Sequence, residues 1–455
     1  MQQIISDLSS FIWGPVMLAF LVGTGVFLLA RFKFLPIRNF WYAVKQAFKK
    51  SESKDGDISS FEALMTSLAA TVGTGNIIGV ATAMSTGGAG ALLWMNIAAI
   101  IGLSVKYAEG VLGVKYREKN KGGEMCGGPM YAIKNGFKVK WAAAPLAVLF
   151  SLFTLLASFG VGNTVQINAV SVSAEEAFSI SPSISGAILA ILVGIVILGG
   201  IKSIGKVSSV LVPFMAIAYI LGALIIIFAR LQFLPGGITQ IVKGAFSLKA
   251  VSGGTTGFIA ARAMRYGVSR GVFTNEAGMG SAGISAAAAR VDYPSKQGYI
   301  TMTSSFFDTI LMCTLTGLCI AVTGVLNTGA SDAQLSILAF KAVFGQAGQY
   351  CITISLALFA FTSVVGWYYN GEKSLGFLTN SKTVVFIYKA AFVIAAYLGA
   401  VIPLRAVWSF ADLANGLMMI PNLICVIALN NVVAKETFAY ERRIVKKLER
   451  RLKRS

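Results

Sequence analysis

The 455-residue chain contains no histidine, and charged residues make up only 13% of it. Histidine is the commonest general base and metal ligand, so its absence excludes the usual histidine-centred catalytic and zinc sites. The charged fraction is about half of the roughly 25% found in soluble proteins. Hydrophobic residues make up 56%, and the mean hydropathy is +0.72. The composition therefore predicts an integral membrane protein, although length alone favours a soluble multidomain protein.

Cysteine is also scarce, and its placement is uninformative for chemistry. Four of the five cysteines lie inside apolar runs and no two form a CxxC motif, so we interpret them as packing residues rather than disulfide partners or metal ligands. A membrane-embedded enzyme would need a nucleophile–base pair or a metal site, and here only carboxylates, Lys and Tyr remain to build one. We therefore expect no enzyme. The cysteines are Cys126, Cys313, Cys319, Cys351 and Cys425.

Long apolar runs, in contrast, are frequent. A membrane-spanning helix needs about 20 apolar residues. The first run has no Lys or Arg before it and no Ala-x-Ala cleavage pattern, so it predicts a helix rather than a signal peptide. The run at 257–289 is the weakest, because it is rich in Gly, Arg and Ser. We predict eleven spans: 11–31, 62–82, 90–113, 141–171, 184–201, 207–229, 257–289, 298–325, 347–372, 383–403 and 407–430.

The formal net charge of +20 follows from where Lys and Arg lie. If the N-terminus is outside, 29 of the 39 Lys and Arg residues fall in the connections on the inner side, as membrane proteins prefer. An odd number of spans then puts the basic tail 433–455 in the cytoplasm. The basic excess is therefore explained by topology and not by nucleic acid. The tail can bind anionic membrane lipid as an amphipathic helix.

Two predicted spans contain close-set glycines and polar residues at mid-membrane. One reads Ala-Ala-Thr-Val-Gly-Thr-Gly-Asn-Ile-Ile-Gly (69–79), and the other reads Arg-Gly-Val-Phe-Thr-Asn-Glu-Ala-Gly-Met-Gly-Ser-Ala-Gly (270–283). An unpaired N–H or C=O in hydrocarbon costs several kcal/mol, so such breaks survive only beside a cavity or ligand. The donors suit a carboxylate and the acceptors suit a cation. The pattern predicts a site for a small molecule with an acid and an ammonium group, or an acid beside a metal cation; the alternative is that these glycines are helix-packing contacts.

The two interrupted spans also stand in a regular relation to each other. Five spans separate the start of one from the start of the other, and because five is odd they enter the membrane from opposite faces. Interrupted segments at corresponding positions in two halves are typical of an inverted repeat. Two long connections, 230–256 and 325–346, are predicted to lie outside, as short helices that gate a cavity or as ordinary surface loops.

The two motifs carry a resemblance to a known family. Phe-Thr-Asn-Glu-Ala-Gly-Met-Gly-Ser-Ala (273–282) and Gly-Thr-Gly-Asn-Ile-Ile-Gly-Val-Ala (73–81) resemble the alanine or glycine:cation symporters, also called sodium:alanine symporters, of the amino acid–polyamine–organocation superfamily. The similarity runs from about residue 10 to 430. It implies an all-α membrane protein of the leucine-transporter architecture, with a 5+5 inverted repeat after one extra helix, and transport by alternating access.

This resemblance implies a division of the chain into segments. They are an extra N-terminal helix (1–31), a basic cytoplasmic segment (32–60), a first five-helix repeat (61–229), an extracellular loop (230–256), a second five-helix repeat (257–432) and a basic cytoplasmic tail (433–455).

The resemblance also implies substrate contacts. The N–H groups of Thr74 and Gly75 would hold the substrate carboxylate, the carbonyls of Thr71, Phe273 and Thr274 would take its ammonium, and the Phe273 ring would close the pocket. Glu276 stands where the leucine-transporter group has a small polar residue; it either contacts the substrate or braces the broken helix, and we favour the brace. The full predicted set is Thr71, Gly73, Thr74, Gly75, Asn76, Gln166, Phe273, Thr274, Asn275, Glu276, Gly278, Gly280 and Trp367.

Sodium ligands follow from the same likeness. Thr362 and Ser363 resemble a hydroxyl pair that coordinates one sodium together with two carbonyls, here those of Ala69 and Val72. A second sodium has a weaker match in the set Thr71, Asn76, Thr274 and Asp308, and Asp308 is also a candidate for carrying a proton.

Three polar features admit more than one interpretation. Asn163 and Gln166 lie one turn apart on the fourth span and face either the cavity or a neighbouring helix. Trp367 lines the substrate side-chain pocket or is an interface aromatic. Lys106 and Glu109, three residues apart, are predicted to form an ion pair at the membrane interface.

Together these observations predict a sodium-coupled symporter of alanine or glycine in the cytoplasmic membrane. It would need no organic cofactor, and a monomer would suffice. One alternative keeps the fold but couples transport to protons through Asp308 or Glu276. Another is an ion channel, because channels also select ions with backbone carbonyls.

Overall fold

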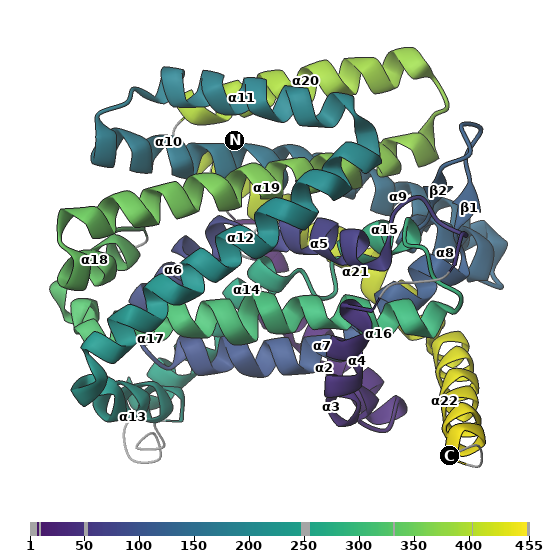
Figure 1. Cartoon of the computed structure of the whole chain (residues 1–455), viewed down its shortest axis with the longest axis horizontal. Coiled ribbons are helices and arrows are strands. Elements are labelled where there is room, and N and C mark those ends of the chain that lie inside the picture. The colour runs from purple at the N-terminus through teal and green to yellow at the C-terminus, as the bar shows by residue number, and fades with distance from the viewer. Residues whose placement is uncertain are drawn as a thin grey trace.

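The computed structural model describes residues 7–8, 11–49, 53–246, 255–330, 333–402 and 404–452 of the chain. Long helices run side by side along one common direction (Figure 1). Among the described residues, seven helices are long and apolar enough to span a membrane, and one bent helix pair makes an eighth. Two further predicted spans are apolar helices of 17 residues. The predicted span 257–289 is a pair of helices with a break between them.

The elements of the first half, in chain order, are α2 (Pro15–Arg31), α3 (Leu35–Arg38), α4 (Phe40–Ala47), α5 (Ser60–Thr71), α6 (Ile78–Gly87), α7 (Ala91–Lys115), the two-stranded antiparallel hairpin β1 (Glu118–Lys119) and β2 (Met125–Cys126), α8 (Pro129–Gly136), α9 (Lys140–Phe159), α10 (Val165–Phe178), α11 (Pro182–Leu198) and α12 (Gly200–Ala229). A 3₁₀ turn (Thr74–Asn76) separates α5 from α6, and a π-helical segment (Gly160–Thr164) joins α9 to α10.

The elements of the second half are α13 (Leu234–Ala245), α14 (Thr255–Asn275), α15 (Ser281–Ala287), α16 (Pro294–Ser305), α17 (Thr314–Thr323), α18 (Ala333–Phe344), α19 (Gln346–Leu378), α20 (Lys382–Val401), α21 (Leu404–Ala428) and α22 (Asn430–Leu452). A π-helical segment (Phe306–Cys313) joins α16 to α17, and 3₁₀ turns (Leu231–Phe233 and Val325–Thr328) precede α13 and α18.

Local sequence explains where several helices begin. Ser59 accepts the N–H of Glu62 at 3.1 Å and Glu62 accepts the N–H of Ser59 at 2.7 Å, which caps the start of α5 reciprocally. Proline stands in the first turn of α8, α11 and α16, where the missing N–H costs nothing because no helical acceptor exists there.

Three helix pairs pack extensively against each other: α7 with α16, α9 with α19, and α11 with α20. In each pair, one helix belongs to the first predicted repeat and the other to the second. Both have the same position in their repeat: the second span for α7 and α16, the third for α9 and α19, and the fourth for α11 and α20. The core of the molecule therefore lies between elements that are far apart in sequence.

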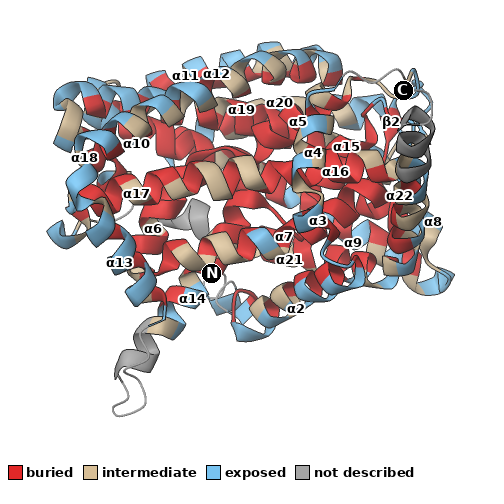
Figure 2. Ribbon diagram, turned by 60° about the horizontal axis from the view of Figure 1, so that its bottom comes forward, coloured by how far each residue is buried: buried red, intermediate tan, exposed pale blue. Residues whose placement is uncertain are grey.

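Outward-facing apolar side chains cover the outer helices. On α12, Val210, Phe214, Ile217, Leu221 and Phe228 recur at helical spacing and are all more than half exposed. Figure 2 shows exposed residues along α11 and α12 and buried residues in the helices behind them. A stripe of exposed apolar side chains on a long helix is what a lipid-facing surface requires.

The connections lie at opposite ends of the bundle. In Figure 1, α13 and α18 are at the left end, and α8 with the β1–β2 hairpin is at the right end. The described residues of 230–256 and 325–346 contain the short helices α13 and α18, and their role as gates on the outer side stays a prediction. At the right end α22 crosses the direction of the long helices, and the Tyr440 hydroxyl lies 2.9 Å from that of Tyr42 on α4.

Candidate functional site

The first break separates α5 from α6, which bend by 62° about it. The Gly73 N–H donates to Asn76 Oδ1 at 2.9 Å, and the Thr74 N–H donates to Gln166 Oε1 at 3.0 Å. In a continuous helix these two N–H groups would bond to the carbonyls of Ala69 and Ala70, four residues earlier. Side chains have therefore taken the donors, and those two carbonyls are left without their helical partners.

The second break lies between α14 and α15 and is built in the same way. The Ala277 N–H donates to Asn275 Oδ1 at 2.9 Å, and the Gly278 N–H donates to Glu109 Oε1 at 3.0 Å. The carbonyl of Thr274 consequently loses its helical donor.

The backbone of this second break is left-handed at three positions. Gly278 has φ +93 and Gly280 has φ +83, a conformation that glycine adopts without steric cost. Glu276 has φ +55, which is uncommon for a residue with a side chain. The glycine-rich sequence at 278–280 is therefore required by the turn itself.

The two breaks contact each other in the buried interior. A Cβ added to Gly75 would lie 3.1 Å from Thr274 Oγ1 and 3.4 Å from Thr274 Cα. Thr74 and Asn76 are 0% exposed, and Thr274 is 2% exposed. The structure thus brings the N–H-rich first break directly against Thr274, whose carbonyl has lost its helical donor in the second break.

From the sequence, Gln166 and Asn163 are expected to face either the cavity or a neighbouring helix, and the structure gives a different answer for each. Gln166 faces the first break, where its Oε1 accepts the Thr74 N–H while its Nε2 donates to the Val161 carbonyl at 3.0 Å. Asn163 donates to the Phe392 carbonyl at 2.8 Å and so faces the neighbouring helix α20. The Thr74 N–H, which the resemblance assigns to the substrate carboxylate, therefore donates to the Gln166 amide oxygen instead.

Glu276 is bonded at both carboxylate oxygens to groups of the protein itself. Trp367 Nε1 on α19 donates to Oε1 at 2.8 Å, and Ser281 Oγ at the start of α15 donates to Oε2 at 2.5 Å. Through these two bonds Glu276 joins the break to the following half-helix and to α19. The Trp367 ring in turn packs against Gly162, where an added Cβ would collide with it.

The residues predicted for a first sodium lie where α19 meets α5. Ser363 Oγ donates to the Val72 carbonyl at 3.2 Å. Thr362 Oγ1 bonds within its own helix to the Phe359 carbonyl at 3.0 Å. The close approach is possible because position 366 is glycine: a Cβ there would lie 2.7 Å from the Ala70 nitrogen. Neutral hydroxyl and carbonyl oxygens suit a hard cation such as sodium.

The residues predicted for a second sodium are only partly brought together. Asn76 Nδ2 donates to Asp308 Oδ1 at 2.8 Å and to the Asp308 carbonyl at 3.0 Å, and Asp308 is 0% exposed. The hydroxyls of Thr71 and Thr274 instead bond to carbonyls of their own helices.

The prediction for Lys106 and Glu109 is wrong. They are 0% and 2% exposed, so both are buried inside the protein, and no ion pair joins them in the described part of the chain. Glu109 Oε1 instead accepts the N–H groups of Gly278 and Gly280 and the Nδ2 of Asn422. Sequence reasoning missed this role, although an ionisable residue well inside an apolar run is itself a signal of function.

The far ends of the two broken helices are joined by main-chain bonds. Ahead of α5, the N–H groups of Asp57 and Ile58 donate to the Ala288 carbonyl at 2.8 and 3.1 Å, and the Arg290 N–H donates to the Ile58 carbonyl at 2.8 Å. The segment that leads into α5 therefore lies along the segment that follows α15.

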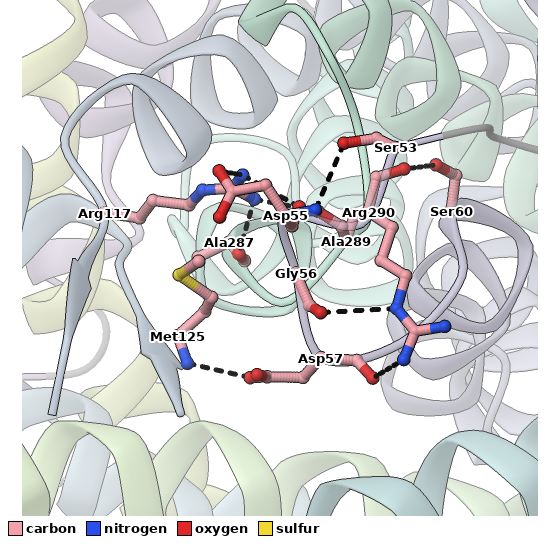
Figure 3. Close-up of polar contacts among 10 residues, drawn as sticks. All are labelled: Ser53, Asp55, Gly56, Asp57, Ser60, Arg117, Met125, Ala287, Ala289 and Arg290. Carbon is pink, nitrogen blue, oxygen red and sulfur yellow. Dashed lines mark hydrogen bonds and ion pairs between the residues drawn. The ribbon is translucent and has the colours of Figure 1, made fainter. Parts of the chain in front are cut away.

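Two arginines reinforce this junction (Figure 3). Arg117 donates to the carbonyls of Ala287 and Ala289 and forms an ion pair with Asp55 at 2.7 Å. The Arg290 guanidinium donates to the carbonyls of Gly56 and Asp57 at 3.2 and 2.9 Å. We call these contacts of 55–58 with 287–290 and Arg117 the end junction.

Comparison with known proteins gives a consistent assignment. The chain matches the sodium:alanine symporter family over residues 1–454. It is 45% identical over 444 residues to the sodium/alanine symporter AgcS of Methanococcus maripaludis, covering 96% of this chain and 97% of that protein. It is 44% identical to an uncharacterized transporter of Haemophilus influenzae, with 97% of each chain covered, and 37% identical to the amino-acid carrier protein AlsT of Bacillus subtilis, with 95% and 90% covered.

Solved structures give a weaker likeness. A manganese transporter of Eremococcus coleocola aligns with a TM-score of 0.49 and 12% identity, over 82% of this chain and 78% of that one.

Proposed function

Because the chain belongs to the sodium:alanine symporter family, we propose that it carries alanine or glycine across the cell membrane together with sodium. With its apolar helices it is a multi-pass membrane protein, and its relatives are transporters rather than enzymes. The observation that carries the proposal is the pair of facing breaks. They leave the carbonyls of Ala69 and Ala70 on one side, and of Thr274 on the other, without helical donors.

The substrate fits between these groups by charge. Its carboxylate takes the N–H groups of Thr74 and Gly75, so the Gln166 oxygen that now accepts from Thr74 gives way to it. Its ammonium takes the carbonyls of Phe273 and Thr274. Gly73 supports a small substrate, because a Cβ there would already lie 2.5 Å from Ser363 Oγ and 2.8 Å from Gln166 Oε1.

Sodium binds in this proposal where α5 meets α19. The carbonyls of Ala69 and Val72 and the hydroxyls of Thr362 and Ser363 provide four oxygens, and the Ser363–Val72 bond supports their proximity. One cation held by both helices ties the first break to α19. Sodium therefore orders the first break, and the first break then offers its N–H groups to the substrate.

Alternating access follows from the arrangement of the two halves. The packing of α7 on α16, α9 on α19 and α11 on α20 supports a 5+5 inverted repeat over 61–229 and 257–432. The end junction holds the α5 and α15 ends together, which corresponds to a molecule closed on that side. We assign that side to the cytoplasm from the distribution of Lys and Arg, and opening it requires the end junction to break.

Uptake into proteoliposomes tests the proposal. An inward sodium gradient at fixed pH is expected to drive accumulation of alanine that saturates with alanine and exchanges with internal alanine. Accumulation driven by external acid and indifferent to sodium would instead favour a proton carried by Asp308 or Glu276. A flux that does not saturate and shows no exchange would favour a channel.

A further inference from the structure

Glu109 is a buried carboxylate that none of the predicted contacts explains. It lies on α7, is 2% exposed, and directs one oxygen at three donors: the N–H of Gly278 at 3.0 Å, the N–H of Gly280 at 3.1 Å and Asn422 Nδ2 at 2.8 Å. Two of these three donors belong to the backbone of the second break. A carboxylate that accepts several N–H groups replaces the acceptors that an interrupted helix lacks.

The bond from Gly278 to Glu109 affects one carbonyl of the site, that of Thr274. In an unbroken helix the Gly278 N–H would bond to the Thr274 carbonyl. Because Glu109 takes this N–H, the Thr274 carbonyl stays available to a ligand. Asn422 on α21 completes the arrangement, since the same Nδ2 donates to the Gly278 carbonyl at 2.8 Å.

Close helix packing brings Glu109 into reach. Gly113, one turn after Glu109, lies against the Gly283 carbonyl, and a Cβ at Gly113 would collide with it. A Cβ at Gly102, two turns before Glu109, would lie 2.8 Å from the Ala277 Cβ. Side chains at either position would push α7 away from the break.

Lys106 supplies the opposite charge in this buried region. It is 0% exposed, and among the described residues its ammonium has no hydrogen-bond partner. It lies three residues before Glu109 on α7. Burying one charge without the other is costly, so a test of Glu109 must change Lys106 with it.

We propose that Glu109 is a positioning residue for transport: with Asn422 it holds the second break open and keeps the Thr274 carbonyl free for the substrate ammonium. This inference rests on the proposed function, in which that carbonyl binds substrate. Glu109 itself does not touch the substrate; it acts through the backbone of 274–280.

Two charge-balanced double variants test the inference. Lys106→Met with Glu109→Gln removes both charges and keeps an acceptor oxygen at position 109, whereas Lys106→Met with Glu109→Leu removes both charges and the acceptor. We expect the Leu variant to raise the KM for alanine about tenfold or more above that of the Gln variant. The half-saturation concentration for sodium-dependent thermal stabilisation, measured without alanine, should agree between them. Equal KM values in the two double variants would overturn the inference.

Asn422→Ala provides a second arm, with Asn168→Ala as its matched control. Asn168 on α10 is also a buried asparagine that donates to two carbonyls, those of Gly399 and Ile402 at the end of α20, and not to the backbone of the second break. Asn422→Ala is expected to raise the KM for alanine, and Asn168→Ala to leave it near the wild-type value. A rise of the same size in both variants would contradict the assignment.

Hydrogen exchange separates failure of this inference from failure of the proposed function. Amide exchange of Gly278 and Gly280 should be about tenfold faster in the Leu double variant than in the Gln double variant, while the segment 57–76 is unchanged in both. The exchange measurement can be interpreted even if the wild-type protein takes up no alanine. Absence of uptake by the wild type would overturn the proposed function alone. Transport by the wild type with equal exchange in both double variants would overturn the role of Glu109 alone.

Discussion

At the scale of single residues, the two breaks depend on side chains that take over backbone hydrogen bonds. Asn76 Oδ1 accepts the Gly73 N–H, and Asn275 Oδ1 accepts the Ala277 N–H. Short amide side chains compete with helical acceptors in this way, which is why they favour turns and caps. We therefore propose that both asparagines serve the substrate through the backbone they shape rather than by direct contact.

Gly73 is the residue at which a single methyl group is expected to fill the site. In Gly73→Ala the new Cβ would lie 2.5 Å from Ser363 Oγ. We expect saturable alanine uptake, normalised to folded protein, to fall about a hundredfold, because the overlap affects both the sodium and the substrate groups. Gly376→Ala on α19 is the matched control, since nothing lies within 4 Å of its added Cβ. Wild-type uptake by Gly73→Ala would contradict the proposed site.

Ser363 offers a separate test of the sodium proposal. Ser363→Ala removes the hydroxyl that donates to the Val72 carbonyl. Loss of one oxygen ligand is expected to raise the sodium concentration for half-maximal uptake about tenfold, with a smaller effect on the maximal rate. Ser374→Ala makes the same change on the same helix, at a buried hydroxyl without a hydrogen-bond partner in the described residues. Sodium dependence that is equal in the two variants would place the cation elsewhere.

The residue scale also defines what sequence reasoning can reach. The glycines and the Asn–Glu pair of 270–283 indicated a break because each is unfavourable in a plain membrane helix. Glu109 was misjudged because its partners, Gly278 and Asn422, are 169 and 313 residues away in the chain. A bond between a side chain and a distant main-chain N–H leaves no local pattern in the sequence.

At the scale of elements, the half-helices α5 and α15 are connected at both of their ends. Their inner ends stand at the two breaks, which contact each other through Gly75 and Thr274, and their outer ends meet at the end junction. We therefore propose that the junction sets the balance between closed and open forms of this side.

Arg117 is the side chain expected to control that balance. Its side chain is 8% exposed, and it bonds to Asp55 as well as to the carbonyls of Ala287 and Ala289. In Arg117→Ala, the amides of 57–58 and 290 should exchange about tenfold faster, because their main-chain bonds lose this support. Lys134→Ala removes an exposed ion pair near the same end and should leave their exchange unchanged. Unaltered exchange in Arg117→Ala would mean that the main-chain bonds suffice.

The ion pair between Glu124 and Lys373 links the hairpin β1–β2 to α19, and its contribution to stability is expected to depend on pH. Burial alone raises the pKa of Glu124, but attraction to Lys373 at 2.6 Å and the hydrogen bond between them outweigh burial and lower it below its usual range. Because the pKa is lower in the folded state, this pair stabilises the fold above the ordinary Glu pKa of about 4.3 and its contribution is lost as the pH falls further. The wild-type advantage in melting temperature over Glu124→Gln should thus be present at pH 7 and shrink below about pH 4. An advantage that grows on acidification would contradict this sign.

Elements were the most predictable level of this fold. Apolar runs of about 20 residues predicted most of the long helices, because hydrocarbon admits little else. The π-helical segments Gly160–Thr164 and Phe306–Cys313 were not predicted. They depend on contacts such as that of Asn163 with the Phe392 carbonyl, which tertiary packing supplies.

At the scale of the whole molecule, the two ends of the bundle differ in charge and in construction. The basic connections, the hairpin and α22 gather at one end, and α13 and α18 lie at the other (Figure 1). If the basic end is cytoplasmic, as the distribution of Lys and Arg predicts, the end junction is an inner closure and α13 and α18 are external. The direction of transport in the proposed mechanism depends on this orientation.

Thiol labelling tests the orientation directly. Cys351 is exposed and the other four cysteines are buried, but Cys351 lies within the predicted span 347–372, so Cys351→Ser serves as the background. In that background, Gln346→Cys places a thiol in the exposed turn between α18 and α19, and a membrane-impermeant maleimide added to intact cells should label it. Adding Lys121→Cys in the Cys351→Ser background places a thiol in the exposed turn of the hairpin, and labelling should then require opened cells. The reverse pattern would invert the topology: the end junction would become the external closure, and the sodium gradient would have to act from the side of the hairpin.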